Sequence, residues 1–176
     1  TDICSKIFFY TCRSPHTGLG VGMFKNKLQI KDYAIPYNYS FPYNDEDIIS
    51  FESEKLNYYT YDRVYINLFT CFHNLTVISL PFAGVSGDIK YFKSLSKLTK
   101  IILNCTGITG NIAHLKSLPN LTYIGLIATS VSGDISNLKS LPKLTDIYLQ
   151  YTGVFGDIEN LTSLPKLNKI CLTDTG

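Results

Sequence analysis

Several common signatures of function are missing from this 176-residue sequence. No apolar run approaches the roughly 18 residues of a membrane-spanning helix, and no charged and then apolar leader opens the chain. Charged residues make up 17% of the sequence and give a net charge of +2, without the clustered basic footprint of a nucleic-acid-binding protein. We therefore expect no membrane insertion, no unprocessed secretory leader and no nucleic-acid partner.

Motifs of catalysis and metal binding are missing as well. The sequence contains no G-x-S-x-G elbow, no P-loop and no H-E-x-x-H segment. Its three histidines, His16, His73 and His114, lie far apart, and none keeps metal-ligand spacing with a cysteine or a carboxylate. The sequence predicts no enzyme, no cofactor and no metal site.

What the sequence does contain is a repeat of 23 residues. Copies begin at Leu75, Leu98, Leu121 and Leu144, and a fifth begins at Leu167 and stops with the chain. The Ile-x-Leu pair of each copy, such as Ile101 and Leu103, predicts a strand with one buried face. A recurring glycine then predicts a turn, which leaves no room for a long helix. A fixed period in this range predicts a solenoid, whose coils bury their apolar faces against each other.

The pattern LxxIxLxxTxVxGxIxxLxxLPx resembles the leucine-rich repeat, and its G-x-I segment is similar to the plant-type subclass. The resemblance implies a short right-handed β-rich/α-β solenoid with a parallel concave sheet. The family's asparagine after the strand is replaced here by Ala83 and then by Thr106, Thr129, Thr152 and Thr175. In the family this asparagine bonds neighbouring backbone turns, and we expect the threonine hydroxyls to do part of the same. Threonine versions with a GDI segment resemble surface and virion proteins of gut bacteria and their phages.

We expect the chain to consist of three parts. Residues 1–47 do not follow the repeat and are either a β-rich cap over the open end of the solenoid or an attachment segment that uses its aromatic side chains. Residues 48–74 are interpreted as a degenerate capping repeat, and residues 75–176 as the repeats proper. Because the fifth copy is incomplete, we expect either that the chain continues past Gly176 or that a second copy or a partner covers this end.

Two further features each allow two interpretations: the cysteines, and the polar residue in the middle of each G-x-I segment. Five cysteines are an odd number, and the coil separation of Cys105 and Cys171 predicts two free thiols. Cys4 and Cys12 are near enough in sequence to form a bridge that would suit a secreted molecule, whereas a reducing compartment explains the odd count equally well. The column of Asp88, Asn111, Asp134 and Asp157 is expected to cap its own turns, with Ca²⁺ binding as the alternative.

The residues that alternate with the buried Ile and Leu are expected to face outward on the concave sheet. They vary between copies, and many are aromatic or aliphatic, which is the composition of a protein interface core. The predicted partner-binding residues are Phe82, Lys100, Ile102, Tyr123, Ile127, Asp146, Tyr148, Tyr151, Lys169 and Asp174.

We therefore expect a non-enzymatic module that recognises a protein partner through the concave sheet. The other interpretation is that these positions carry strand-forming residues only. The alternative function is a structural or decoration protein of a virion or cell surface, docked through residues 1–47. An extracellular, cell-surface or virion location is favoured over the cytoplasm, and self-association through the C-terminal end is a further expectation.

Overall fold

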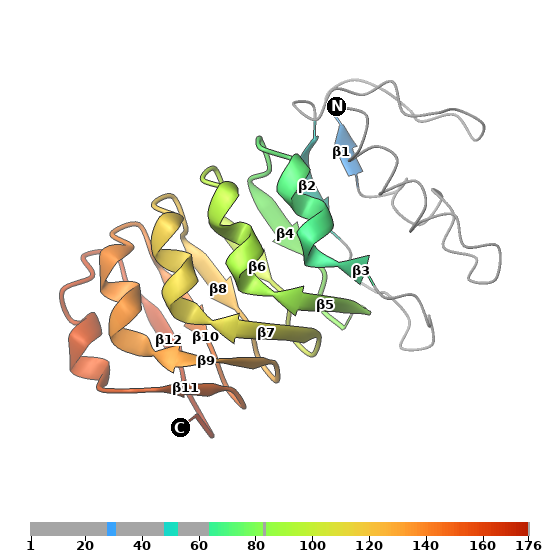
Figure 1. Ribbon diagram of the computed structural model, residues 1–176. Coiled ribbons are helices and arrows are strands. Elements are labelled where there is room, and N and C mark those ends of the chain that lie inside the picture. Colours follow the sequence, from blue (N-terminus) through green and yellow to red (C-terminus); the bar gives the residue numbers. More distant parts are fainter. Residues whose placement is uncertain (1–27, 31–47, 53–63, 83, 176) are drawn as a thin grey trace, which may run out of the picture.

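The computed structural model describes residues 28–30, 48–52, 64–82 and 84–175. Successive coils stack side by side from the N-terminal to the C-terminal end (Figure 1). Each coil from β2 to η6 contributes one strand to a large sheet, one strand to a smaller sheet and one short 3-10 helix, and the last coil contributes only the strand β12. This is the solenoid that the 23-residue period predicts.

The large sheet is the concave sheet, and its strand order is β1-β2-β4-β6-β8-β10-β12. All its pairs are parallel except the antiparallel pair of β1 and β2. The strands are β1 (Leu28–Ile30), β2 (Ile48–Glu52), β4 (Val77–Ser79), β6 (Lys100–Ile102), β8 (Tyr123–Gly125), β10 (Asp146–Tyr148) and β12 (Lys169–Cys171).

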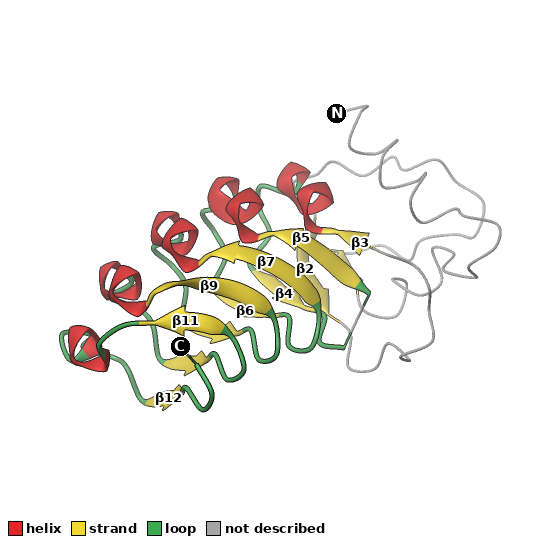
Figure 2. Cartoon of the chain, turned by 60° about the horizontal axis from the view of Figure 1, so that its bottom comes forward, coloured by secondary structure: helices red, strands yellow, loops and turns green. Residues whose placement is uncertain are grey.

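A second, parallel sheet was not anticipated from the sequence. It has the order β11-β9-β7-β5-β3 and lies beside the row of helices (Figure 2). Its strands are β3 (Val64–Tyr65), β5 (Val85–Asp88), β7 (Gly107–Asn111), β9 (Ser130–Asp134) and β11 (Gly153–Phe155). The segment expected to be only a turn is thus a strand, which carries the recurring glycine within it or at its end.

In the described part of the chain, five 3-10 helices form the third side of the coils. They are η2 (Ile66–Cys71), η3 (Ile89–Ser94), η4 (Ile112–Ser117), η5 (Ile135–Ser140) and η6 (Ile158–Leu161). From η3 onward each helix has an Asp or Asn cap, whose side chain accepts the backbone N–H two residues further on; at Asp134 the distance is 2.7 Å. The expected capping role of this column is confirmed.

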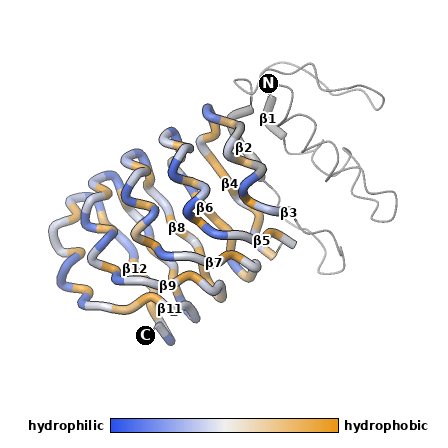
Figure 3. Tube along the Cα trace, in the orientation of Figure 1, coloured by the Kyte–Doolittle hydropathy of each residue, from blue (hydrophilic) through white to orange (hydrophobic). Residues whose placement is uncertain are grey.

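The core consists of ladders of one residue type that run from coil to coil. Leu98, Ile101 and Leu103 are fully buried, as are their counterparts Leu121, Ile124 and Leu126 one coil later. Apolar stretches therefore recur at the same place in successive coils (Figure 3). Burying these side chains supplies the main stabilising free energy, at roughly 1.5 to 3 kcal/mol for each fully buried side chain.

Threonines join the coils at the start of each concave strand. The hydroxyl of Thr122 donates to the carbonyl of Thr99 at 2.9 Å, and Thr99 and Thr145 make the same bond to the preceding coil. The threonines that replace the family's asparagine act differently, because Thr129 Oγ1 donates to the carbonyl of Leu126 in its own coil at 2.6 Å. The hydroxyl therefore closes its own turn and makes no bond to a neighbouring coil.

The turn that follows each concave strand uses a left-handed residue that is not glycine. The φ angles are between 52° and 59° at Phe82, Cys105, Ala128, Tyr151 and Asp174. The first four of these residues donate their backbone N–H to a carbonyl of the next coil, as Ala128 does to Gln150 at 2.9 Å. This extension of the sheet hydrogen bonding holds the turn in a conformation that side chains rarely adopt.

The N-terminal part of the chain is described at β1 and β2 only. Phe51 of β2 is the register partner of Ile78, so a concave strand is present although the repeat signature is lost there. The rest of residues 1–47, including Cys4 and Cys12, lies outside the described residues. The expected boundaries near residues 47 and 74, and the docking role of the first segment, stay predictions.

Candidate binding face on the concave sheet

The strand residues predicted to bind a partner form two rows across the concave sheet. Register pairing places Lys100, Tyr123, Asp146 and Lys169 next to each other in the first row. The second row contains Ile102, Gly125, Tyr148 and Cys171. Because a strand presents alternate residues on one face, both rows lie on the side opposite the buried Ile ladder.

Four of these side chains form a stack that runs across the strands. Lys100 Nζ lies 5.2 Å from the centroid of the Tyr123 ring. The Tyr123 and Tyr148 rings follow with centroids 5.3 Å apart and planes 29° apart, and Lys169 Nζ lies 5.1 Å from the Tyr148 centroid. We call this group the lysine–tyrosine stack. It combines a stacked aromatic pair with one lysine ammonium near each ring.

Gly125 makes room for the stack, and the sequence analysis missed its role. A Cβ atom at Gly125 would lie 3.2 Å from Cε1 of Tyr123 and 3.1 Å from Oδ1 of Asn104. The glycine is itself buried although its position faces outward. The signal in the sequence is a glycine at a position where the other copies have Ser79, Ile102, Tyr148 and Cys171.

Asn104 supports the same region from the preceding coil. Its side-chain Oδ1 accepts the backbone N–H of Ile127 at 3.0 Å, which fixes the chain just after β8. Ile127 is half-buried at this turn. It therefore belongs to the margin of the face, and Asn104 is a second supporting residue that the sequence analysis did not select.

The electrostatics of the stack favour a neutral Tyr123 and a charged Lys169. Burial, followed by the proximity of Tyr148, raises the pKa of the Tyr123 hydroxyl above its ordinary value. A hydrogen bond to the Tyr148 side chain is the main cause that raises the pKa of the Lys169 ammonium. At neutral pH, Lys169 therefore carries its positive charge and Tyr123 keeps its proton.

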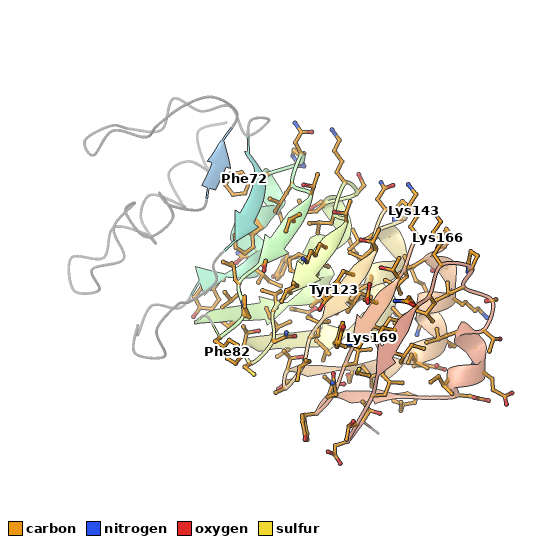
Figure 4. All side chains as sticks on the ribbon, turned by 180° about the vertical axis from the view of Figure 1, so that it is seen from behind. Phe72, Phe82, Tyr123, Lys143, Lys166 and Lys169 are labelled. Atoms are coloured by element: carbon orange, nitrogen blue, oxygen red, sulfur yellow. The ribbon has the colours of Figure 1, made fainter. Side chains whose placement is uncertain are left out.

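Asp146 places one negative charge beside the stack. Its Oδ2 accepts a hydrogen bond from Thr145 Oγ1 at 2.6 Å, and its register partners are Tyr123 and Lys169. Figure 4 shows Tyr123 and Lys169 over neighbouring parts of the sheet, whereas Lys143 and Lys166 lie toward one end of the coils. The face thus has two lysines and one aspartate among its row residues.

The structure does not bring all the predicted residues into this cluster. Phe82, Tyr151 and Asp174 lie in the left-handed turns beyond the strands, and the first two are 46% and 60% exposed. Phe82 and Tyr151 are three coils apart, so they do not form one aromatic patch. Ile102 is half-buried in the second row, on the strand next to Gly125.

Comparisons with known proteins agree on the architecture. No family model matches the sequence, and no curated protein matches it. Among solved structures, a plant peptide hormone receptor, RGFR1 in complex with RGF2, aligns with a TM-score of 0.56 and 26% identity over 64% of this chain and 19% of the receptor. An internalin from Listeria monocytogenes aligns with a TM-score of 0.54 and 22% identity over 62% of this chain and 32% of the internalin. The fold is the leucine-rich-repeat solenoid.

A third leucine-rich-repeat structure is closer in length. The ectodomain of the receptor kinase SOBIR1 from Arabidopsis thaliana aligns with a TM-score of 0.53 and 18% identity, over 74% of each chain. The likeness to plant receptors agrees with the plant-type G-x-I segment of the repeat. Since this chain covers 32% of the internalin and 19% of the hormone receptor, the activities of those whole proteins are not carried over to it.

Metal ligands, thiols and helix lengths bear on other kinds of chemistry. Among the described residues, no group of three or more His, Cys, Asp or Glu is arranged to hold a metal ion. Cys105 and Cys171 are free thiols, as their coil separation predicts. Within the same described part of the chain, no helix has the length and apolarity needed to cross a membrane.

Proposed function

We propose that this chain is a non-enzymatic recognition module that binds a protein partner through the concave sheet. The binding face is centred on the lysine–tyrosine stack, with Ile102 and Asp146 beside it. Phe82, Ile127, Tyr151 and Asp174 lie on the margin and add contacts to a partner large enough to reach the turns. Tyrosines that are partly desolvated and held rigidly are the kind of residue that dominates binding free energy at protein interfaces.

One observation carries the proposal. The buried columns keep apolar residues from coil to coil, whereas the two outward rows vary between coils and contain one ordered cluster of side chains. Stability of the solenoid does not require this cluster, because the threonine ladder and the apolar columns already join the coils. Similar solenoids include a hormone receptor in complex with its peptide, which supports a peptide or protein as the partner class.

The location that we propose is outside the cell or on a surface. The similar structures include an internalin and the ectodomain of a receptor kinase. A surface-exposed recognition module is consistent with a frame whose outward rows differ between coils.

The proposal is tested by selecting binders and then removing the tyrosines. A displayed library of random eight-residue peptides is selected on the whole chain, and affinities of the synthetic winners are measured by calorimetry. Tyr148→Ala combined with Tyr151→Ala is expected to weaken binding at least about tenfold, since hot-spot tyrosines contribute about 2 kcal/mol each. The melting temperature should change little, because neither ring belongs to the buried core.

Tyr91→Ala is the matched control. Tyr91 lies on η3, away from the concave sheet, is 40% exposed and has Lys90 Nζ 5.3 Å from its ring centroid. It should leave the affinity unchanged. Failure to select any binder that depends on the two concave-side tyrosines would overturn the proposed function.

A further inference from the structure

We propose that the concave face reads an extended acidic segment, in which two carboxylates four residues apart each contact one lysine of the stack. This inference rests on the proposed function and names the chemistry of its partner. The feature that carries it is the series of contacts from Lys100 through Tyr123 and Tyr148 to Lys169, which crosses four neighbouring strands.

Each tyrosine ring already has two neighbours in the stack. Tyr123 lies between Lys100 of β6 and Tyr148 of β10, and Tyr148 lies between Tyr123 of β8 and Lys169 of β12. A ligand meets ring edges, which are the positive part of the aromatic quadrupole, together with the two ammonium groups.

These groups favour negative charge at both ends of the stack. Lys100 is half-buried and Lys169 is exposed, so both ammonium groups are accessible to a ligand. Hydrogen bonding to Tyr148 raises the pKa of Lys169 and so favours its charged form. Charge-assisted hydrogen bonds from an ammonium to a carboxylate are among the stronger polar contacts in proteins.

The middle of the site selects against a third acid. Asp146 lies in register between Tyr123 and Lys169, and its carboxylate would repel a carboxylate placed above it. The preferred ligand is therefore acidic at both ends and neutral in the middle. A serine, threonine or asparagine there can donate to Asp146, which accepts one hydrogen bond from Thr145.

The spacing follows from the geometry of strands. Lys100 and Lys169 are on strands that are three neighbours apart, which corresponds to about 14 Å at the usual strand spacing. An extended peptide rises about 3.3 Å per residue, so residues i and i+4 are about 13 Å apart and point to the same side. A segment that crosses the strands can thus place one acid on each lysine. Residue i+2 then lies about 7 Å from each lysine, between the positions of Tyr123 and Asp146 in the first row.

The experiment uses the eight-residue peptide library selected on the whole chain. We expect enrichment of Asp or Glu pairs separated by three residues, with few acids at the middle position. Two synthetic peptides of equal charge are then compared, one with acids at i and i+4 and one with the same acids adjacent. The spaced peptide should bind about fivefold more tightly than the adjacent-acid peptide. This factor corresponds to the affinity that one additional exposed ion pair contributes at most.

Lysine variants test whether Lys100 and Lys169 are the residues that contact the acids of the peptide. Lys100→Gln and Lys169→Gln should each weaken the spaced peptide about fivefold, whereas Lys93→Gln and Lys139→Gln on the helices should leave its affinity within about twofold. Lys93 and Lys139 are exposed and serve as matched charge controls.

The outcomes separate the two proposals. Binders that depend on Tyr148 and Tyr151 but show no enrichment of acids, or that bind Lys100→Gln and Lys169→Gln as tightly as the parent, would overturn the acidic-segment inference and leave the proposed function intact. Equal affinity for the spaced and adjacent acids would overturn it as well, since that result indicates general charge attraction. Absence of any binder on the concave face overturns both.

Discussion

At the scale of single residues, the binding face depends on two small side chains with opposite roles. Gly125 is buried beneath the Tyr123 ring because a larger residue would occupy the space of the stack. Ala128, three residues later, is exposed and has a φ of 52°, a left-handed conformation that disfavours any side chain. The first residue is fitted to its neighbours, and the second is tolerated because its N–H bonds to the next coil.

Replacing Ala128 by glycine should therefore stabilise the protein. Ala128→Gly removes the Cβ atom that opposes the left-handed turn and loses no buried surface, so the free energy of unfolding should rise by about 1 kcal/mol. Chemical denaturation measures the change. Ala113→Gly is the control, because Ala113 lies in η4, where the same substitution should lower the free energy of unfolding by about 0.5 to 1 kcal/mol. A loss of stability in both variants would contradict the role assigned to the turn.

At the scale of elements, the caps of the 3-10 helices differ in charge but not in geometry. Asp134 Oδ1 accepts the N–H of Ser136, and Asn111 Oδ1 accepts the N–H of Ala113 in the preceding coil. The hydrogen bonds from Ser136 are the main cause that lowers the pKa of Asp134. The chain thus contains a titratable and a neutral version of one cap.

This difference predicts a pH dependence. Because the folded-state pKa of Asp134 is lowered, its ionised cap stabilises the fold above the unfolded-state pKa of about 4, and this contribution is lost as the pH falls through the folded-state value. Asp134→Asn should keep the cap and make stability less sensitive to pH below about 4. Asn111→Asp should do the reverse. Thermal melts between pH 2 and 7 test both, and identical pH profiles for the parent and the two variants would exclude the linkage.

The strands, caps and turns also show which parts of the fold could be predicted from the sequence. The buried Ile and Leu columns predicted the concave strands, and the recurring Asp or Asn predicted the caps, because both signals repeat in every coil. The second sheet escaped prediction because, of the two inward positions of a strand such as Gly107–Asn111, one is Ile108 and the other is Gly110. One apolar side chain in five residues is too short a hydrophobic alternation to indicate a strand. The left-handed turns at Phe82 and Tyr151 escaped because no glycine marks them.

The lysine–tyrosine stack was predicted only in part. Aligning the copies placed Lys100, Tyr123, Tyr148 and Lys169 on one face, but the ring contact joins different rows of neighbouring strands. The contact between the Tyr123 and Tyr148 rings has room to form because Gly125 has no side chain beside the Tyr123 ring. A diagonal contact of this kind depends on side-chain volume in three dimensions, and the column pattern carries no such information.

At the scale of the whole molecule, the C-terminal end of the 176-residue chain presents an apolar surface. A hollow of about 380 Å³ is lined there by Ile158, Leu161, Leu164, Leu167 and Ile170, with Glu159 and Thr162. Ile158 is 49% exposed, although its counterparts Ile112 and Ile135 are buried. The strand β12 also ends the order of the concave sheet. The hollow favours contact with another apolar surface, and the edge of β12 favours pairing with another strand.

We expect this end to cause self-association of the 176-residue chain. Ile158→Asp places a charge in the hollow and should lower the average molar mass at high protein concentration, which light scattering measures. Tyr91→Asp, on the exposed side of η3, is the control and should leave the molar mass unchanged. A parent chain that stays monomeric at all accessible concentrations would rule out this interface.

In a solenoid, the number of coils sets the distance between the two lysines of the binding face. Each 23-residue coil adds one strand, so a tandem duplication of residues 121–143 would insert a strand between Lys100 and Lys169 without altering any buried column. The gap between the two cations would widen by about 4.8 Å, or one to two residues of an extended ligand. Gene-level gain or loss of one coil would then retune which spacing of charges is read, in a single step and with the same building block.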